Sequence, residues 1–558
     1  MGDALKAGLN RLLRGLPACI ALVAASALAG AQSDLPRAAV QDGVSRLMVH
    51  GKPFLIRGGE LGNSSAGTAA EADEILPRLA QMHLNTVLMP VAWEQIEPEE
   101  GRFDFSILDH WLDVARQQNM RLVLLWFGSW KNAFSEYAPA WVKADTKRFP
   151  REISADGLPT EILSPLGAET QTADSRAFAA LMKHLRERDA QQQTVLMIQV
   201  ENEIGFLGRG GRDRSDTANQ LFEQAVPDQL MRALAARRTS LSPELASHFN
   251  PAGHAWRDVF GDAADEVFMA WHYGRFADAV AAAGKKEYAL PMYMNAQLPA
   301  PFERGGDYPS GGPHLYFQDV YRAGAPAIDF YAPDIYWPNF EYWVDRYRTA
   351  GNPVFVPEAR LAGGQYNALY VYGEALGFGF SPFAVESARA PEDPKAGPGL
   401  GDVYAAIEHL NDDILDAQAS KQIRALVLHA ASARPMQTVA LGGYLFDATL
   451  SRSWPARALE TDDGAMIVIQ KGPGKDGQAE FLVAGSGLTV TITRDPDTDS
   501  RVAGIASIEQ LRWTDGKWST ERRLNGDQSN QGRQFQMDAH AMRVYRVKLY
   551  AYPREEQR

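Results

Sequence analysis

The sequence predicts an α/β fold, a (β/α)8 TIM barrel followed by a smaller antiparallel β-sandwich domain. From about residue 45 to about residue 415, apolar runs alternate with amphipathic segments in units of about 46 residues, which suits eight strand–helix pairs. After about residue 420, strand-like runs follow one another and are separated by turns rich in Gly, Asp and Pro. A doubly wound open sheet is the alternative, but its glycine-rich phosphate turn, G-x-G-x-x-G, does not follow the first strand.

The first 31 residues have the pattern of a cleavable signal peptide. Three basic residues precede an apolar run at residues 16–29, and small residues at 29–31 provide a cleavage site. The run has about 14 residues, fewer than the roughly 20 of a membrane-spanning helix, so a retained membrane anchor is the less favoured alternative. We therefore expect an exported protein, periplasmic or extracellular, with no membrane contact in its mature form.

Composition excludes several classes of function. The only cysteine, Cys19, lies inside the predicted signal peptide, so the mature chain would have no disulfide, no catalytic thiol and no cysteine-bound metal. The net charge of −13, without a long basic run, argues against nucleic acid and anionic membranes as partners. The 11 histidines include no H-E-x-x-H motif, so a zinc hydrolase is not expected.

The eight predicted barrel strands are continuous apolar runs, as expected for strands that are buried on both faces. Amphipathic segments such as residues 105–118 lie between them and predict the surrounding helices. The barrel domain is expected to span residues 32–415, with its largest insertion after the fourth strand, at about residues 205–288. The predicted strands lie at residues 53–59, 86–91, 122–127, 194–202, 290–296, 327–336, 353–358 and 377–383.

The C-terminal domain is expected to span residues 416–558 and to form an antiparallel sandwich beside the barrel. Its predicted strands are short runs rich in Val, Ile, Leu and aromatic residues, which favour extended structure. These strands lie at residues 425–431, 465–471, 479–485, 488–494 and 542–552.

Carboxylates end two of the predicted strands, and the active sites of such barrels lie at the C-terminal ends of the strands. Asn202 and Glu203 end the fourth strand and Glu358 ends the seventh, so the two glutamates should face each other across the barrel mouth. Two opposed carboxylates are the equipment of a glycosidase: one protonates the leaving oxygen, and the other attacks the anomeric carbon or activates water. For either glutamate alone, solvation or helix capping would be the simpler interpretation. Glu60, after the first strand, could pair with Arg57.

The segment IQVENEIG at residues 198–205 resembles the acid/base motif of glycoside hydrolase family 35, a family of β-galactosidases built on (β/α)8 barrels. Residues 50–61, 85–115 and 139–142 look like the same family. The C-terminal block resembles the sandwich of a bacterial subgroup, some of whose members remove galactose from xyloglucan side chains. The neighbouring β-galactosidase family 42 is the alternative within the same chemistry.

The resemblance implies that Glu203 is the general acid/base, Glu358 is the nucleophile and Asn202 binds the sugar 2-hydroxyl. It implies a retaining exo-β-galactosidase that needs no metal and no cofactor. The expected substrate is a galactosylated oligosaccharide, such as a xyloglucan fragment, while the oligomeric state is not predicted.

One position departs from the family pattern. Many members carry Ala-Glu-Trp after strand three, and the glutamate of that motif binds galactose, whereas this chain places Asn132 there. A related exo-glycosidase, such as a β-arabinosidase or a β-glucosidase, is therefore an alternative. A carbohydrate-binding barrel without catalysis is a second alternative, although a binder would need neither glutamate.

Aromatic residues near the strand ends are further candidates for sugar binding, because an aromatic face stacks on the apolar side of a pyranose. Trp130 follows strand three, and Tyr336 and Trp337 follow strand six. The Tyr336 hydroxyl could also orient the nucleophile. Asn295, at the end of strand five, is a weaker candidate.

Overall fold

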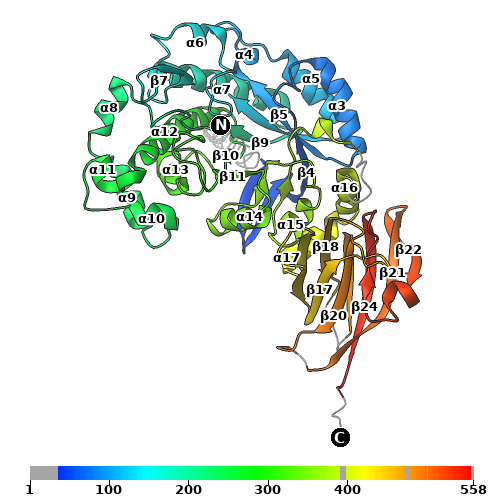
Figure 1. Ribbon diagram of the computed structural model, residues 1–558. Coiled ribbons are helices and arrows are strands. Elements are labelled where there is room, and N and C mark those ends of the chain that lie inside the picture. The colour runs from blue at the N-terminus through cyan, green and yellow to red at the C-terminus, as the bar shows by residue number, and fades with distance from the viewer. Residues whose placement is uncertain (1–34, 390–396, 473–477, 499, 555–558) are drawn as a thin grey trace, which may run out of the picture.

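The computed structural model describes residues 35–389, 397–472, 478–498 and 500–554. The predicted signal peptide and Cys19 lie outside these residues. Helices surround a parallel sheet in the N-terminal part of the molecule, and antiparallel sheets form the C-terminal part (Figure 1). The predicted fold class is thus confirmed. Within the described ranges, no helix is both long enough and apolar enough to cross a membrane.

The barrel sheet consists of parallel strands in the order β12-β14-β4-β5-β6-β9-β10-β11-β13. β12 and β13 are two parts of one strand, interrupted at Pro357, and they pair with β14 and β11 respectively. The strand order therefore returns to its start and the barrel closes. All eight predicted runs overlap these strands. They are β4 (Ile56–Glu60), β5 (Thr86–Ala92), β6 (Arg121–Phe127), β9 (Val195–Val200), β10 (Met292–Gln297), β11 (Phe330–Ile335), β12 (Phe355–Val356), β13 (Glu358–Ala359) and β14 (Gly379–Phe380).

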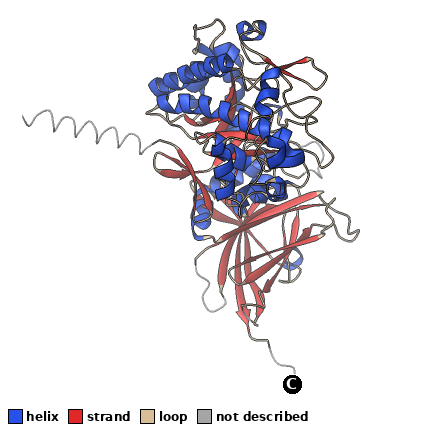
Figure 2. Cartoon of the chain, turned by 90° about the vertical axis from the view of Figure 1, so that its left-hand side faces the viewer, coloured by secondary structure: helices blue, strands red, loops and turns tan. Residues whose placement is uncertain are grey.

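Amphipathic helices cover the outside of the barrel (Figures 1 and 2). In α5 the buried side chains Leu108, Trp111, Leu112 and Ala115 follow the spacing of one helical face. The helices are α3 (Ala69–Gln81), α4 (Trp93–Ile96), α5 (Ser106–Gln117), α6 (Ala140–Ala144), α7 (Ala168–Asp189), α8 (Asp216–Phe222), α9 (Asp228–Ala236), α10 (Pro243–His248), α11 (Trp256–Phe260), η1 (Gly261–Ala263), α12 (Ala264–Glu287), α13 (Gln318–Gly324), α14 (Phe340–Thr349), α15 (Asn367–Gly373), η2 (Val385–Ser387), α16 (Leu400–His409) and α17 (Asn411–Ser420).

The loops at the C-terminal ends of the strands are long, as predicted. The segment between β9 and β10 holds α8 to α12, which confirms the large insertion after the fourth strand. The loop between β6 and α7 carries a two-stranded antiparallel sheet of β7 (Arg151–Ile153) and β8 (Pro159–Leu163). These loops form the walls around the barrel mouth.

An N-terminal sheet that the sequence analysis did not identify lies at the opposite end of the barrel. It consists of β1 (Arg37–Gln41), β2 (Val44–Val49) and β3 (Lys52–Phe54), and β3 runs almost directly into the first barrel strand. Leu47 and Val49 join the apolar cluster that fills the barrel interior. Because this end is packed with side chains, the strand ends at the other face are left for a site.

Two antiparallel sheets make up the C-terminal domain, in the orders β15-β18-β19-β24-β21-β22 and β16-β17-β20-β23. The predicted boundary at residue 416 falls inside α17, and the first strand of this domain begins at Ile423. Four of its longer strands, β16, β17, β21 and β22, were not predicted. The strands are β15 (Ile423–His429), β16 (Met436–Leu441), β17 (Tyr444–Leu450), β18 (Asp463–Gln470), β19 (Ala479–Ser486), β20 (Leu488–Arg494), β21 (Val502–Thr514), β22 (Lys517–Leu524), β23 (Phe535–Gln536) and β24 (Arg543–Tyr552), and η4 (Gly526–Ser529) lies between β22 and β23.

In the six-stranded sheet, β15, β18 and β19 are buried on both faces. One face packs on the four-stranded sheet, and the other joins the core of the barrel domain through residues such as Ile467 and Leu482. α15 lies directly against this sheet, and a Cβ at Gly373 would come within 2.6 Å of the Ala425 Cβ. Glycine is needed at position 373 because the helix and the sheet approach so closely.

Candidate active site

The turn after β9 carries the first candidate carboxylate into the barrel mouth. Glu201 and Glu203 both have left-handed backbone angles, with φ of 58° and 44°, which are uncommon for residues other than glycine. The Asn295 side-chain oxygen accepts a hydrogen bond of 3.0 Å from the Glu203 backbone N–H. The Glu201 carboxylate accepts one of 2.9 Å from the Trp130 backbone N–H. These contacts hold Glu201 in the core and leave Glu203 at the cavity.

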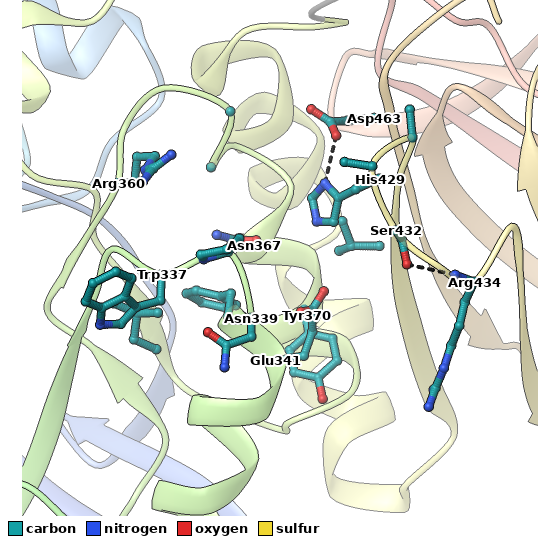
Figure 3. Close-up of a pocket in the computed structure, with 18 of the residues that line it drawn as sticks. Trp337, Asn339, Glu341, Arg360, Asn367, Tyr370, His429, Ser432, Arg434 and Asp463 are labelled. Atoms are coloured by element: carbon teal, nitrogen blue, oxygen red, sulfur yellow. Dashed lines mark hydrogen bonds and ion pairs between the residues drawn. The ribbon is translucent and has the colours of Figure 1, made fainter. Parts of the chain in front are cut away.

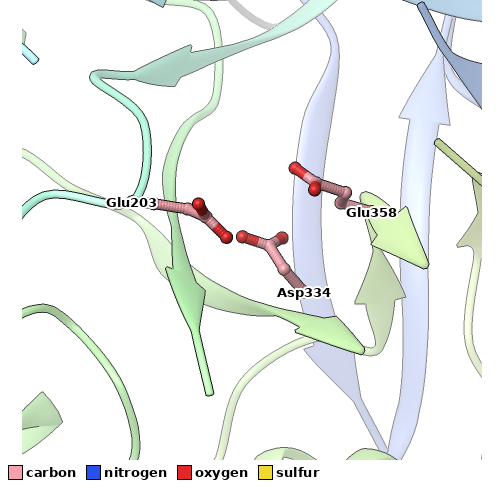
Figure 4. Close-up of side chains that lie close together, drawn as sticks. All are labelled: Glu203, Asp334 and Glu358. Carbon is pink, nitrogen blue, oxygen red and sulfur yellow. The ribbon is translucent and has the colours of Figure 1, made fainter. Parts of the chain in front are cut away.

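Three carboxylates from different strands meet at this face of the barrel. Glu203, Asp334 and Glu358 each bring an oxygen within 4.8 Å of the other two (Figure 4). The structure therefore brings together the two glutamates that were expected to face each other. Asp334 was missed in the sequence, although it carries the same signal, a carboxylate at the C-terminal end of a buried strand.

A fourth carboxylate, that of Glu60, lies beside this group and is almost fully buried. The suggestion that Glu60 pairs with Arg57 is wrong. The Arg57 guanidinium points to the other end of the barrel, where it contacts the Glu408 carboxylate at 2.9 Å and the His83 carbonyl at 2.8 Å. Burial and the negative charge of Glu358 raise the pKa of Glu60 well above its usual range.

Each of the two candidate catalytic glutamates has a neutral hydrogen-bond donor. The Asn132 side-chain amide donates to Glu203 Oε2 at 2.7 Å, and the Tyr336 hydroxyl donates to Glu358 Oε1. Asn295 links the two sides of the site, because its amide also donates to Asp334 Oδ2 at 2.7 Å. The donors hold both carboxylates in place without neutralising their charge.

The pKa of Glu203 is raised to about 7. Burial is the larger cause and the negative charge of Glu358 is the next, while the Lys131 ammonium and the amide of Asn132 act in the opposite direction. The pKa of Asp334 is also raised well above its usual range, by burial and by the charges of Glu358 and Glu203. Glu203 can therefore carry a proton at near-neutral pH, as a general acid must.

Lys131 is the cation that lines this cavity within the described part of the chain. Its ammonium donates to the Asn202 side-chain oxygen at 2.9 Å and lies 5.1 Å from the centre of the Phe127 ring. Four buried carboxylates therefore share one positive charge. This imbalance adds to burial, which is the larger cause of the raised pKa values of Glu60, Glu203 and Asp334.

The candidate active site is a cavity of about 380 Å³ that closes around these carboxylates. Five of the residues proposed from the sequence line it, namely Asn132, Glu203, Tyr336, Trp337 and Glu358. A cavity of this size and polarity is in the range of small-molecule sites. The remaining lining residues are Asn63, Lys131, Gln297, Leu298, Asp334 and Phe383.

Three of the proposed sugar-binding residues do not line the cavity. Trp130 is fully buried, and its indole N–H donates to the Leu163 carbonyl at 3.0 Å, so a stacking role for this tryptophan is wrong. Its ring packs into the core because the chain turns after residue 130, with Asn132 in a left-handed conformation. Asn202 and Asn295 are also buried, and they hold Lys131 and the Glu203 backbone rather than facing the cavity.

Carboxylate oxygens at the spacing of Glu203, Asp334 and Glu358 could also bind a hard divalent cation. Such a cation would use the same oxygens that proton transfer and nucleophilic attack need. The two uses of the three carboxylates therefore exclude each other.

Comparison with protein families matches residues 65–235 to a glycoside hydrolase family described as "Beta-galactosidase", family 42. Residues 400–536 match a family described as a domain of unknown function, DUF5597. No curated protein matches the chain. The match supports a glycoside hydrolase that acts on a carbohydrate. The matching family model is that of family 42, and no match supports family 35, which the sequence motifs resemble.

Solved structures with similar folds include three bacterial glycosidases. The β-amylase catalytic domain from Paenibacillus polymyxa is 12% identical, covering 60% of this chain and 93% of that one, with a TM-score of 0.42. The β-galactosidase from Marinomonas ef1 is 12% identical over 65% of this chain and 60% of that one, with a TM-score of 0.42. The β-galactosidase from Rahnella sp. R3 is 17% identical over 66% of this chain and 57% of that one, with a TM-score of 0.41. The chain thus spans less than two thirds of either β-galactosidase.

Proposed function

We propose that this protein is a retaining exo-β-galactosidase, with Glu203 as general acid/base and Glu358 as nucleophile. The observation that carries the proposal is the approach of these two carboxylates, whose oxygens come within 4.8 Å across a cavity of about 380 Å³. Carboxyl groups about 5–5.5 Å apart are typical of retaining glycosidases, whereas inverting enzymes need about 6.5–9.5 Å to place a water between them.

In the first step, the Glu358 carboxylate attacks the anomeric carbon and the bond from this carbon to the glycosidic oxygen breaks. The proton of Glu203 passes to the departing oxygen, so that the aglycone leaves as an alcohol and the sugar is held as an ester of Glu358. A pKa of about 7 keeps much of Glu203 protonated at near-neutral pH. The Tyr336 hydroxyl holds the attacking carboxylate in position.

In the second step, Glu203 takes a proton from water, and the oxygen of that water attacks the anomeric carbon and breaks the ester. The first step has removed the negative charge of Glu358, which is one cause of the raised pKa of Glu203. The pKa of Glu203 therefore falls, and Glu203 is then a carboxylate that can accept the proton. Two inversions at the same carbon give retained configuration.

A terminal β-D-galactosyl residue is the proposed sugar. The family match and the sequence resemblance both favour a β-galactosidase, and the cavity has the size of a site for one end of a glycan. Asn132 donates to Glu203 in this chain, so the contacts to the sugar hydroxyls must come from other lining residues, such as Asn63 and Gln297. We further propose that the protein is exported and acts on plant cell-wall oligosaccharides such as xyloglucan fragments, as its N-terminal pattern and C-terminal resemblance suggest.

Turnover of a panel of aryl β-glycosides, followed by NMR of the first sugar formed, tests this proposal. We expect the galactoside to have the highest kcat/KM and the β-anomer of galactose to appear first. A higher kcat/KM for the arabinoside or the glucoside would show that the enzyme prefers that sugar to galactose. First release of the α-anomer would overturn retention, and no turnover of any glycoside would overturn catalysis itself.

A further inference from the structure

A large cavity lies between the barrel and the C-terminal domain, next to the candidate active site. Its volume is about 1060 Å³. We call it the interdomain groove, and Figure 3 shows side chains from both domains around it. On the barrel side it is lined by the segment after β11, the start of α14, the loop before α15 and α15 itself. On the other side it is lined by the end of β15, the loop that follows it, the start of β16, and Asp462 and Asp463.

The interdomain groove and the catalytic cavity share a wall. Tyr336 and Trp337 line both spaces, and both side chains are more than one third exposed. The indole N–H of Trp337 donates to the Leu298 carbonyl at 3.2 Å, and Arg360 donates to the Tyr336 carbonyl at 2.9 Å. The shared segment is thus held in place, and the groove lies directly beside the cavity.

The lining of the groove suits a neutral sugar chain. Trp337, with Tyr370 and Met436, offers aromatic and apolar surface, and Asn339 and Asn367 offer amides that can bind hydroxyl groups. The charged side chains comprise two arginines and four carboxylates, of which Asp463 is paired with His429 at 2.7 Å. A groove with this balance of charge repels a polyanion rather than attracting it.

We infer that the interdomain groove binds the leaving-group part of the substrate, a neutral β-linked oligosaccharide whose terminal sugar occupies the catalytic cavity. The inference rests on the proposed function and names the part of the substrate that the small cavity cannot hold. The C-terminal domain then contributes directly to substrate binding, through Arg434 in the loop between β15 and β16 and Met436 at the start of β16. The Arg434 backbone N–H donates to Ser432 Oγ, which shapes this loop (Figure 3).

Kinetics with two substrates test the groove. The double variant Arg434→Ala/Met436→Ala removes two exposed side chains from the C-terminal wall, far from the reacting atoms. We expect KM for a galactosylated β-glucan oligosaccharide to rise about tenfold, with kcat changed by less than about twofold, because only binding of the leaving group is lost. An aryl galactoside does not reach the groove, so its kinetics should stay as in the wild type. Arg554→Ala, at an exposed arginine of the same domain outside the groove, is the matched control.

Binding without catalysis separates failure of this inference from failure of the proposed function. Titration calorimetry of the full chain with a β-1,4-linked glucan tetrasaccharide needs no turnover. We expect binding by the wild type and by Arg554→Ala, about tenfold weaker binding by the double variant, and no binding of trigalacturonate. The inference is overturned if the glucan does not bind, if the double variant binds it as the wild type does, or if trigalacturonate binds as tightly.

Discussion

Two sets of buried carboxylates in this molecule have different surroundings. Outside the cavity, Glu97 accepts hydrogen bonds from Arg176 at 2.7 Å, from the Gly101 N–H and from the Trp93 indole. Around the cavity, each of Glu60, Asp334 and Glu358 keeps one buried oxygen without a hydrogen-bond partner among the described residues.

Asp189 belongs to the first set. Its carboxylate accepts from Arg116 at 2.9 Å and from the backbone N–H groups of Thr194 and Val195 at 3.0 and 2.8 Å. These donors compensate the negative charge of Asp189, so the carboxylate stabilises the fold.

Glu60 and Asp334 at the barrel mouth lack such a full set of donors, and burial together with the negative charge of Glu358 raises the pKa of both. A buried carboxylate that is surrounded by donors, such as Asp189, stabilises the fold. A buried carboxylate with fewer donors, such as those at the cavity, is suited to proton transfer and catalysis.

Glu358→Gln should have the largest effect, because an amide cannot attack the anomeric carbon. We expect kcat/KM for an aryl β-galactoside to fall by at least about 10³-fold. Steady-state kinetics measure the fall. Glu99→Gln is the matched control, since Glu99 is 70% exposed and contacts only Arg102. A rate near that of the wild type in Glu358→Gln would show that the nucleophile lies elsewhere.

Glu203→Gln should lower kcat/KM by about 10²–10⁴-fold for substrates with poor leaving groups, and much less for dinitrophenyl galactoside, which needs no proton. The pH profile gives a second readout. Wild-type kcat/KM should fall as the pH rises through about 7, because Glu203 loses the proton it must donate. This alkaline limb should vanish in Glu203→Gln with the activated substrate. If the limb persists, another group supplies the proton.

Asp189→Asn tests the structural side of the comparison. Replacing this carboxylate leaves Arg116 with a weaker partner, and we expect the free energy of unfolding to fall by about 2–4 kcal/mol.

At pH 8, Glu203→Gln should instead raise the free energy of unfolding. The pKa of Glu203 is raised in the folded state to about 7, so folding loses stability as the pH rises from the usual glutamate range through about 7, and a neutral amide avoids this loss. Urea unfolding of both variants measures the change in the free energy of unfolding. If both variants change it in the same direction, the distinction between the two sets of carboxylates is wrong.

Tyr336→Phe should have the smallest effect of this series. It removes the hydroxyl that donates to Glu358 Oε1, a hydrogen bond to a charged group, and we expect kcat/KM to fall about 10–100-fold. Tyr342→Phe is the control, since its exposed hydroxyl accepts from Arg346 away from the cavity. Unchanged kinetics in Tyr336→Phe would mean that the nucleophile is positioned by its other neighbours.

The sequence was sufficient where hydrophobic pattern alone decides the structure. Continuous apolar runs identified all eight barrel strands, and the last residues of two runs located Glu203 and Glu358. Asp334 lies within the apolar run at residues 327–336, so the pattern does not mark it as the end of a strand. In the N-terminal sheet, β1 is largely exposed, so no apolar run marks it.

Side-chain direction at the barrel mouth could not be predicted. Trp130 and Asn132 are two residues apart, yet one is in the core and the other lines the cavity. The difference comes from the left-handed backbone at Asn132 and from the hydrogen bond between the Trp130 N–H and Glu201. Both depend on contacts between strands that the order of residues does not reveal.

The six-stranded sheet, whose inner face joins the barrel core, makes the two domains one thermodynamic unit. Its residues Ile467 and Leu482 share a continuous apolar cluster with α15, so separating the domains would expose this surface to water. The calorimetric melting curve should therefore show a single cooperative transition. The barrel domain therefore depends on its contacts with the C-terminal domain, and we expect that it does not fold when the C-terminal domain is deleted.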